Sequence, residues 1–124
     1  MFSAGKVALL VTAALFFGGC GGRSKPIPTA LSVQTFPSDG VAYVGQAPPW
    51  NQVSFTAYLH YDDGSIGANP VTSVQWATDP QDYWVILNGN VVTCFQASPS
   101  RALVHATAQV NGVTLEGLGT MWCD

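Results

Sequence analysis

Three consecutive stretches in the second half of the chain decide the expected fold: Val74-Gln75-Trp76-Ala77-Thr78-Asp79-Pro80, Tyr83-Trp84-Val85-Ile86-Leu87 and Asn88-Gly89-Asn90-Val91-Val92-Thr93-Cys94. The first is a strand that carries a Trp and is stopped by Asp-Pro. The second is a short apolar strand. Asn-Gly is a typical hairpin turn, so the third stretch returns as a strand that ends on a cysteine. This succession predicts the middle of a small β-sandwich.

The chain on both sides of this centre continues with short strands and turns. Residues 52–61 alternate most clearly, with apolar side chains on one face of a strand and polar ones on the other. The apolar set is Val53, Phe55, Ala57 and Leu59, and the polar set is Ser54, Thr56, Tyr58 and His60. Further strands are predicted at residues 29–36, 41–44, 71–77, 102–110 and 113–123, the last with a bulge at Gly117 and Gly119. Seven or eight short strands predict an all-β antiparallel sandwich or barrel.

The first 28 residues have the composition of a leader and a tether. Lys6 precedes an apolar run at residues 7–17, after which Gly18 and Gly19 lead to Cys20. A charged start, a short apolar core and a small-residue site are typical of a secretory signal peptide. The run is too short to cross roughly 30 Å of hydrocarbon as a helix. Residues 20–28, rich in Gly, Ser and Pro, are expected to form a flexible tether before a domain at residues 29–124.

The end of the leader, Phe16-Phe17-Gly18-Gly19-Cys20, resembles that of bacterial lipoprotein precursors. The resemblance implies a signal peptide at residues 1–19 and lipid attachment at Cys20, with acyl chains such as palmitate anchoring the protein to a membrane of the cell envelope. Phe17 departs from the family, which most often has Leu there. Gly21 in place of Asp favours the outer membrane if the source is Gram-negative. The alternative is an ordinary secreted protein cleaved nearby.

Three cysteines leave one unpaired in an exported protein. If Cys20 carries the lipid that the resemblance implies, Cys94 and Cys123 remain as a pair. Exported proteins enter an oxidising compartment, where disulfides persist. We therefore expect a Cys94–Cys123 disulfide. A zinc site or a reactive thiol is the alternative, although neither cysteine has a CxxC partner or a His at ligand spacing.

A buried Trp76 in a middle strand, beside a disulfide, favours an immunoglobulin-like sandwich over an open barrel. The order of several segments also resembles bacterial Ig-like domains of group 2, the intimin- and invasin-related type. These segments are Gln52-Val53-Ser54-Phe55-Thr56-Ala57, Tyr61-Asp62-Asp63-Gly64-Ser65, Val74-Gln75-Trp76, Asn88-Gly89-Asn90-Val91-Val92 and Val104-His105-Ala106-Thr107-Ala108. The resemblance spans about residues 31–123 and implies an adhesion, spacer or contact module rather than an enzyme. Pro48-Pro49-Trp50, Tyr83-Trp84 and the two cysteines depart from the pattern, and fold analogy does not identify a partner.

Charge excludes one class of partner. From residue 29 onward Arg101 is the only Lys or Arg, whereas all seven Asp and Glu residues lie in that part of the chain. A nucleic-acid-binding protein needs a basic face to neutralise phosphates. We therefore expect no nucleic-acid partner.

No pattern of residues predicts catalysis or metal binding. His60 and His105 fall on polar strand faces, where a solvated side chain is the simplest interpretation. Asp62-Asp63-Gly64 is typical of a turn; calcium, which takes about six to eight oxygen ligands, is the alternative. Asp79 and Asp82 flank Pro80 in a loop without an evident pocket. The sequence thus predicts no catalytic residue, no metal, no cofactor and no enzyme.

Aromatic residues are the remaining candidates for contact with a ligand. Four Trp and four Tyr in so small a domain cannot all be fully buried. Trp50 lies in a Pro-rich loop, and the Tyr83-Trp84 pair lies at a strand start, so these three predict contacts with a glycan or a protein. The alternative is that they cap the ends of the sandwich. The sequence predicts a lipid-anchored Ig-like module with a structural, adhesive or protein-binding role; a carbohydrate- or small-ligand-binding lipoprotein is the second hypothesis.

Overall fold

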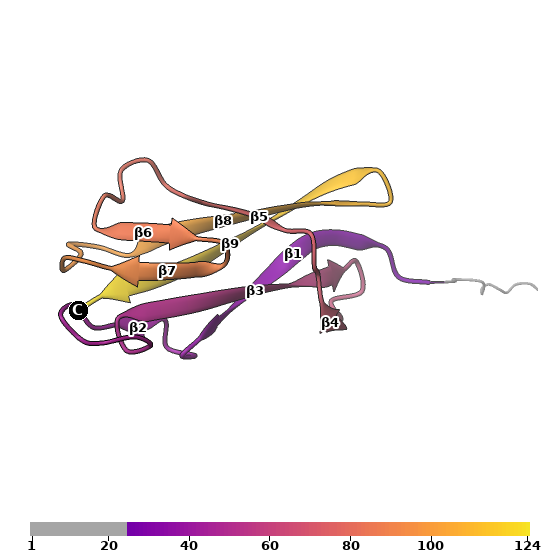
Figure 1. The fold of residues 1–124 in the computed structure, drawn as a ribbon. Coiled ribbons are helices and arrows are strands. Elements are labelled where there is room, and N and C mark those ends of the chain that lie inside the picture. The colour runs from indigo at the N-terminus through magenta and orange to yellow at the C-terminus, as the bar shows by residue number, and fades with distance from the viewer. Residues whose placement is uncertain (1–24) are drawn as a thin grey trace, which may run out of the picture.

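The computed structural model describes residues 25–124, in which nine β-strands form two sheets (Figure 1). The strands are β1 (Pro28–Phe36), β2 (Val41–Ala42), β3 (Gln52–Tyr61), β4 (Ile66–Pro70), β5 (Gln75–Thr78), β6 (Val85–Asn88), β7 (Val91–Cys94), β8 (Ala102–Val110) and β9 (Val113–Cys123). The all-β prediction is confirmed. The signal peptide, Cys20 and the first part of the tether lie outside the described residues. In residues 25–124 no helix has the length and apolar character needed to cross a membrane.

The strand order is that of an immunoglobulin-like sandwich. One sheet has the order β1-β3-β7-β6, with β4 also paired to β3, and the other has the order β2-β9-β8-β5. These orders correspond to the ABED and GFC sheets of constant-type Ig domains. β2 is an additional strand. After β1 the chain crosses to the second sheet, where β2 pairs in parallel with β9. The other strand pairs are antiparallel. The predicted fold is therefore confirmed, with nine strands instead of seven or eight.

One strand prediction in the middle of the chain was wrong in its bounds. The sequence predicted a strand at residues 71–77, whereas the structure has β4 at Ile66–Pro70 and only the short β5 at Gln75–Thr78. β4 pairs with the last part of β3 through an irregular register. Its free edge tolerates Pro70, because a proline at a sheet edge leaves no ladder donor missing.

The core lies between the sheets in two clusters. The first contains Phe55, Val104, Met121 and the two cysteines, and the second contains Leu31, Ala57 and Leu115. Val53, Phe55 and Ala57 are buried, which confirms the inward face predicted for residues 52–61, and Leu59 is partly buried against the second cluster.

The buried tryptophan is a different one from that expected. Trp76 lies on β5, at the edge of the four-stranded sheet, and is only half-buried. Its ring contacts that of Phe55, with a centroid separation of 6.0 Å and a tilt of 48°. Trp84, which precedes β6, is 8% exposed and belongs to the same cluster as Cys94 and Cys123. Trp84 is therefore the core tryptophan beside the disulfide.

A disulfide joins Cys94 of β7 to Cys123 of β9, with a Cα–Cα distance of 5.6 Å, and so links the two sheets. Antibody domains carry their disulfide between the strands equivalent to β3 and β8. In this chain those strands contribute Phe55 and Val104 to the core. The bond closes a loop of 29 residues, for which the chain-entropy model gives about 3–4 kcal/mol.

Gly117 and Gly119 allow close packing and do not form a bulge. The register between β8 and β9 is continuous from the pair Ala102–Met121 to the pair Val110–Val113. A Cβ atom on Gly119 would lie 2.7 Å from Val33 Cγ1 and 2.8 Å from Phe55 Cε2. A Cβ atom on Gly117 would lie 2.5 Å from the Leu31 carbonyl oxygen. The two glycines therefore allow β9 to pack directly on β1 and β3.

Candidate functional site

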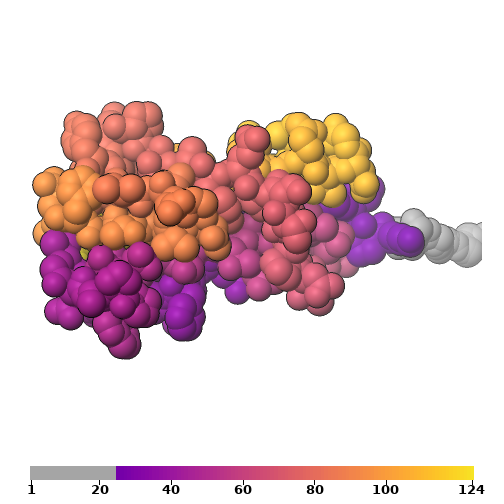
Figure 2. All heavy atoms as spheres, viewed as in Figure 1, coloured from indigo at the N-terminus to yellow at the C-terminus, as the bar shows by residue number. Residues whose placement is uncertain are grey.

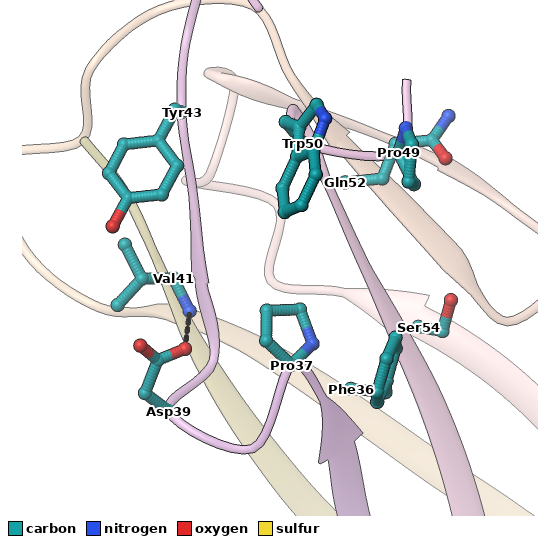
Figure 3. Close-up of a pocket in the computed structure, with 9 residues that line it drawn as sticks. All are labelled: Phe36, Pro37, Asp39, Val41, Tyr43, Pro49, Trp50, Gln52 and Ser54. Carbon is teal, nitrogen blue, oxygen red and sulfur yellow. Dashed lines mark hydrogen bonds between the residues drawn. The ribbon is translucent and has the colours of Figure 1, made fainter. Parts of the chain in front are cut away.

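A groove of about 450 Å³ lies where the chain passes from the first sheet to the second. We call it the aromatic groove. Its walls come from the end of β1, the β1–β2 turn, β2, the β2–β3 loop and the start of β3. The lining residues are Phe36, Pro37, Asp39, Val41, Tyr43, Pro49, Trp50, Gln52 and Ser54 (Figure 3).

The end of β1 and the turn after it form one side of the groove. Phe36 is the last residue of β1 and pairs in register with Ser54 of β3, so both side chains lie on the outer face of the sheet. The Gly40 N–H donates to the Pro37 carbonyl at 2.9 Å, and Gly40 has φ +69°. This conformation costs a glycine little. It turns the chain toward the other sheet, where Val41 pairs with Trp122.

The loop between β2 and β3 forms the other side. The Tyr43 N–H donates to the Trp50 carbonyl at 2.9 Å, and the Trp50 N–H donates to the Ala47 carbonyl at the same distance. The Gln52 N–H donates to the Pro49 carbonyl at 3.1 Å. These three bonds fold the loop back on itself, so that Tyr43 and Trp50 flank one hollow (Figure 3).

The groove leaves large apolar side chains exposed to solvent. Phe36 is 77% exposed, Trp50 65% and Tyr43 45%. Pro37 lies between the three aromatic rings, and Pro49 lies next to Trp50 (Figure 3). Single exposed apolar residues are ordinary, but a concave apolar cluster with a few polar groups is the usual form of a binding site.

The groove carries one charged side chain, and that side chain is engaged in the turn. Asp39 Oδ1 accepts the N–H of Val41 at 3.1 Å, the bond drawn in Figure 3. The other polar groups are neutral. The Gln52 Nε2 donates to Thr93 Oγ1 at 3.3 Å, and Ser54 contributes a hydroxyl. The site thus combines exposed rings with amide and hydroxyl groups.

Of the three aromatic residues singled out from the sequence, one lines the groove. Trp50 is on its wall, whereas Tyr83 is 70% exposed at another place on the surface. The rings of Tyr83 and Trp84 lie edge to face, with a centroid separation of 6.1 Å. Trp84 itself is buried. Its Nε1 has no hydrogen-bond acceptor. A buried ring offers no face to a ligand, so the structure places Trp84 in the core instead of at a contact site.

Phe36 and Tyr43 are groove residues that the sequence analysis missed. A signal for Phe36 was present. It lies an odd number of residues after the inward-facing Leu31 and Val33 of the same strand, so its side chain points to the opposite face. An outward-facing Phe next to Pro37 is an exposed aromatic. Tyr43 gave no local signal, since its position depends on the hydrogen bond to Trp50 across the loop.

Five of the seven acidic residues bind the backbone through their carboxylates. Each of five aspartates accepts a backbone N–H: Asp39 from Val41, Asp62 from Ile27, Asp63 from Ser65, Asp79 from Gln81 and Asp82 from Leu103. The shortest bond, to Asp82 Oδ2 at 2.7 Å, belongs to the one of these residues that is buried. Such bonds fix turns and loops. Within residues 25–124 no group of three or more His, Cys, Asp or Glu residues could hold a metal ion.

The two histidines lie on different sheets. His60 is on β3 and is half-buried, while His105 is exposed on β8. The two sheets and the core separate their outward faces, so the histidines cannot act on one substrate.

A second hollow of about 410 Å³ opens beside β4 and the β6–β7 turn. Phe55, Trp76 and Asn90 are among its lining residues. Asn90 is already bonded twice to Phe55: its Nδ2 donates to the Phe55 carbonyl and its own carbonyl accepts the Phe55 N–H, both at 2.8 Å. These bonds hold the turn against β3, which leaves this hollow a packing feature of the sandwich edge.

No family model, curated protein or solved structure matches the chain. The class of the protein therefore follows from its own geometry. It is an immunoglobulin-like β-sandwich with an aromatic groove at the crossing between its sheets.

Proposed function

We propose that the protein is a lipoprotein of the cell envelope, anchored to a membrane through Cys20, whose Ig-like module binds another envelope component through the aromatic groove. The role is structural or adhesive, and no catalytic step is involved. The observation that carries the proposal is the grouping of Phe36, Tyr43 and Trp50, all exposed, around one concave space. Concave apolar surfaces with a few placed polar groups are where proteins bind ligands.

The position of the groove suits a tethered protein. β1 starts at Pro28 and ends at Phe36 on the groove, a span of about 26 Å for an extended strand of this length. In Figure 1 the chain enters β1 at one end of the sandwich, and β2 lies at the other. The atoms of the β2–β3 loop form a lobe at that far end in Figure 2. A lipid on Cys20 would therefore hold the groove away from the membrane.

A sedimentation experiment tests the binding role. The full-length protein, purified in detergent, is mixed with insoluble envelope material from the producing cells, and the bound fraction is measured as the protein concentration is varied. We expect Trp50→Ala and Tyr43→Ala to weaken binding at least about tenfold, because each change removes an exposed ring from the groove.

Tyr83→Ala is the matched control, because Tyr83 is also an exposed tyrosine but lies outside the groove. This variant is expected to bind as the unaltered protein does. Equal binding by the unaltered protein and both groove variants would contradict the proposal and leave a spacer role without a ligand.

A further inference from the structure

We propose that the ligand of the aromatic groove is a neutral polysaccharide chain, which extends from the groove along the outer face of the five-stranded sheet. The inference rests on the proposed binding function and names the chemistry of its ligand.

The groove continues into a strip of outward-facing side chains. β1 and β3 pair in register at Phe36–Ser54, Gln34–Thr56 and Ser32–Tyr58. Register partners in an antiparallel pair lie on the same face, and alternate pairs share that face. Val33 and Phe55, between them in the strands, pack into the core on the opposite side. A row of side chains therefore leads from the floor of the groove toward the start of β1.

This face has no formal charge. None of the five strands of the sheet contains Asp, Glu, Lys or Arg. The side chains that can form hydrogen bonds along the strip, such as Gln34, Thr56 and Tyr58, are amides and hydroxyls. Amides and hydroxyls can both donate and accept. An anionic ligand would lose hydration on this face without gaining an opposite charge, and the one carboxylate of the groove, on Asp39, already accepts the Val41 N–H.

A sugar ring fits this combination of groups. One face of a pyranose carries C–H groups and is apolar, while its hydroxyl groups project around the rim. The apolar face packs on an exposed aromatic ring such as Trp50, since a large ring gives contact area at little conformational cost. The rim hydroxyls both donate and accept, as do the amide of Gln52 and the hydroxyl of Ser54, which line the same groove.

Two kinds of protein ligand fit less well. A peptide cannot add as a strand at the groove floor, because this part of β3 is already paired on both sides, with β1 and with β7. A proline-rich peptide could use an aromatic-lined groove. Such a segment offers carbonyl acceptors and few donors, however. The oxygen atoms of the strip would therefore find no N–H or O–H groups to accept from.

The experiment is calorimetric titration of the full-length protein in detergent with a fixed panel of probes: dextran, soluble mannan, hydroxyethyl cellulose and amylose as neutral chains, polygalacturonate as an acidic chain, and decaproline as a peptide. We expect at least one neutral chain to bind, and its affinity to be the same at about 0.05 and 0.5 M NaCl because no ion pairs form. Trp50→Ala should weaken that binding at least about tenfold, and Tyr83→Ala should not change it.

A second variant tests the path along the sheet. Thr56→Glu places a charge on the strip, outside the residues that line the groove. It should weaken binding of the long chain while leaving binding of a di- or trisaccharide from the same polymer unchanged. Equal effects on both lengths would overturn the extended path. Near-UV circular dichroism of each variant separates loss of the ligand contact from loss of the fold.

The remaining outcomes are also decisive. Binding of decaproline or polygalacturonate that depends on Trp50, without binding of any neutral chain, would overturn the ligand class and keep the proposed function. Binding of envelope material that depends on Trp50, without binding of any probe in the panel, would do the same. If neither the envelope material nor any probe responds to Trp50→Ala, the proposed function itself fails.

Discussion

The backbone N–H of Tyr43 donates to the carbonyl of Trp50 at 2.9 Å and closes the loop that carries two of the three exposed rings of the groove. The backbone positions from which both rings project are thus fixed before any ligand arrives. A ligand that meets a preformed site loses less free energy in ordering it. The sugar ligand that we propose would therefore meet a loop that is already folded.

The disulfide is the first target for a stability measurement. Replacing Cys94 and Cys123 together by Ala should lower the free energy of unfolding by about 2–5 kcal/mol, because the bond links the two sheets of a small domain. Urea unfolding followed by fluorescence measures the change, and the unaltered protein in excess reductant is the control. A double variant as stable as the oxidised protein would contradict a stabilising role for the bond.

Gly119→Ala tests the close packing of β9. The added Cβ atom would meet Val33 and Phe55 at 2.7 and 2.8 Å, so we expect a loss of about 1–3 kcal/mol from overpacking. Gly67→Ala is the matched control in a strand, because its nearest neighbours would lie at 3.6 Å or more. Chemical denaturation measures both variants, and equal stabilities would show that β9 has room for the methyl group.

Asp82 should stabilise the loop before β6 through one backbone contact. Its Oδ2 accepts the Leu103 N–H at 2.7 Å, and the residue is 9% exposed. Asp82→Ala leaves that N–H without its partner and should cost about 1–3 kcal/mol. The exposed Glu116→Ala is the control, with a change within about 0.5 kcal/mol. Thermal unfolding measures the loss of stability in both variants. Similar losses for the two would argue against this bond as a stabilising contact.

Membrane anchoring is tested at the leader. Cells that express the protein are given an alkyne fatty acid, and label on the protein is measured together with its distribution between membrane and soluble fractions. Cys20→Ala should abolish the label and release the protein, because two or more acyl chains are needed for stable anchoring. Ser24→Ala, in the tether, should retain both properties. Unchanged labelling of Cys20→Ala would refute the lipoprotein proposal.

Local periodicity was sufficient for part of the fold. Residues 52–61 alternate so regularly that their inward face could be read from the sequence, and the structure confirms it at Val53, Phe55 and Ala57. β4 could not be predicted in this way. Ile66-Gly67-Ala68-Asn69-Pro70 has no alternation, and it becomes a strand only because β3 offers an edge for pairing.

The tryptophans show why the site was predicted only in part. Trp76 lies in a strand and Trp84 only precedes one, yet β5 is at a sheet edge and Trp84 packs beside the disulfide. Which of the two is buried depends on the order of strands, and sequence pattern does not encode that order locally. That Phe36 and Trp50 line one groove likewise depends on the crossing from β1 to β2, although Trp50 itself was found from its proline-rich loop.

The most direct measurement is the change in backbone amide NMR shifts of the full-length protein, in detergent micelles, on titration with the neutral polysaccharide that binds most tightly. We expect the largest changes at Tyr43, Trp50 and Gln52, with smaller ones at Gln34 and Thr56 along the strip. Changes confined to β8 and β9, on the opposite sheet, or no saturable change with any neutral chain, would contradict this expectation.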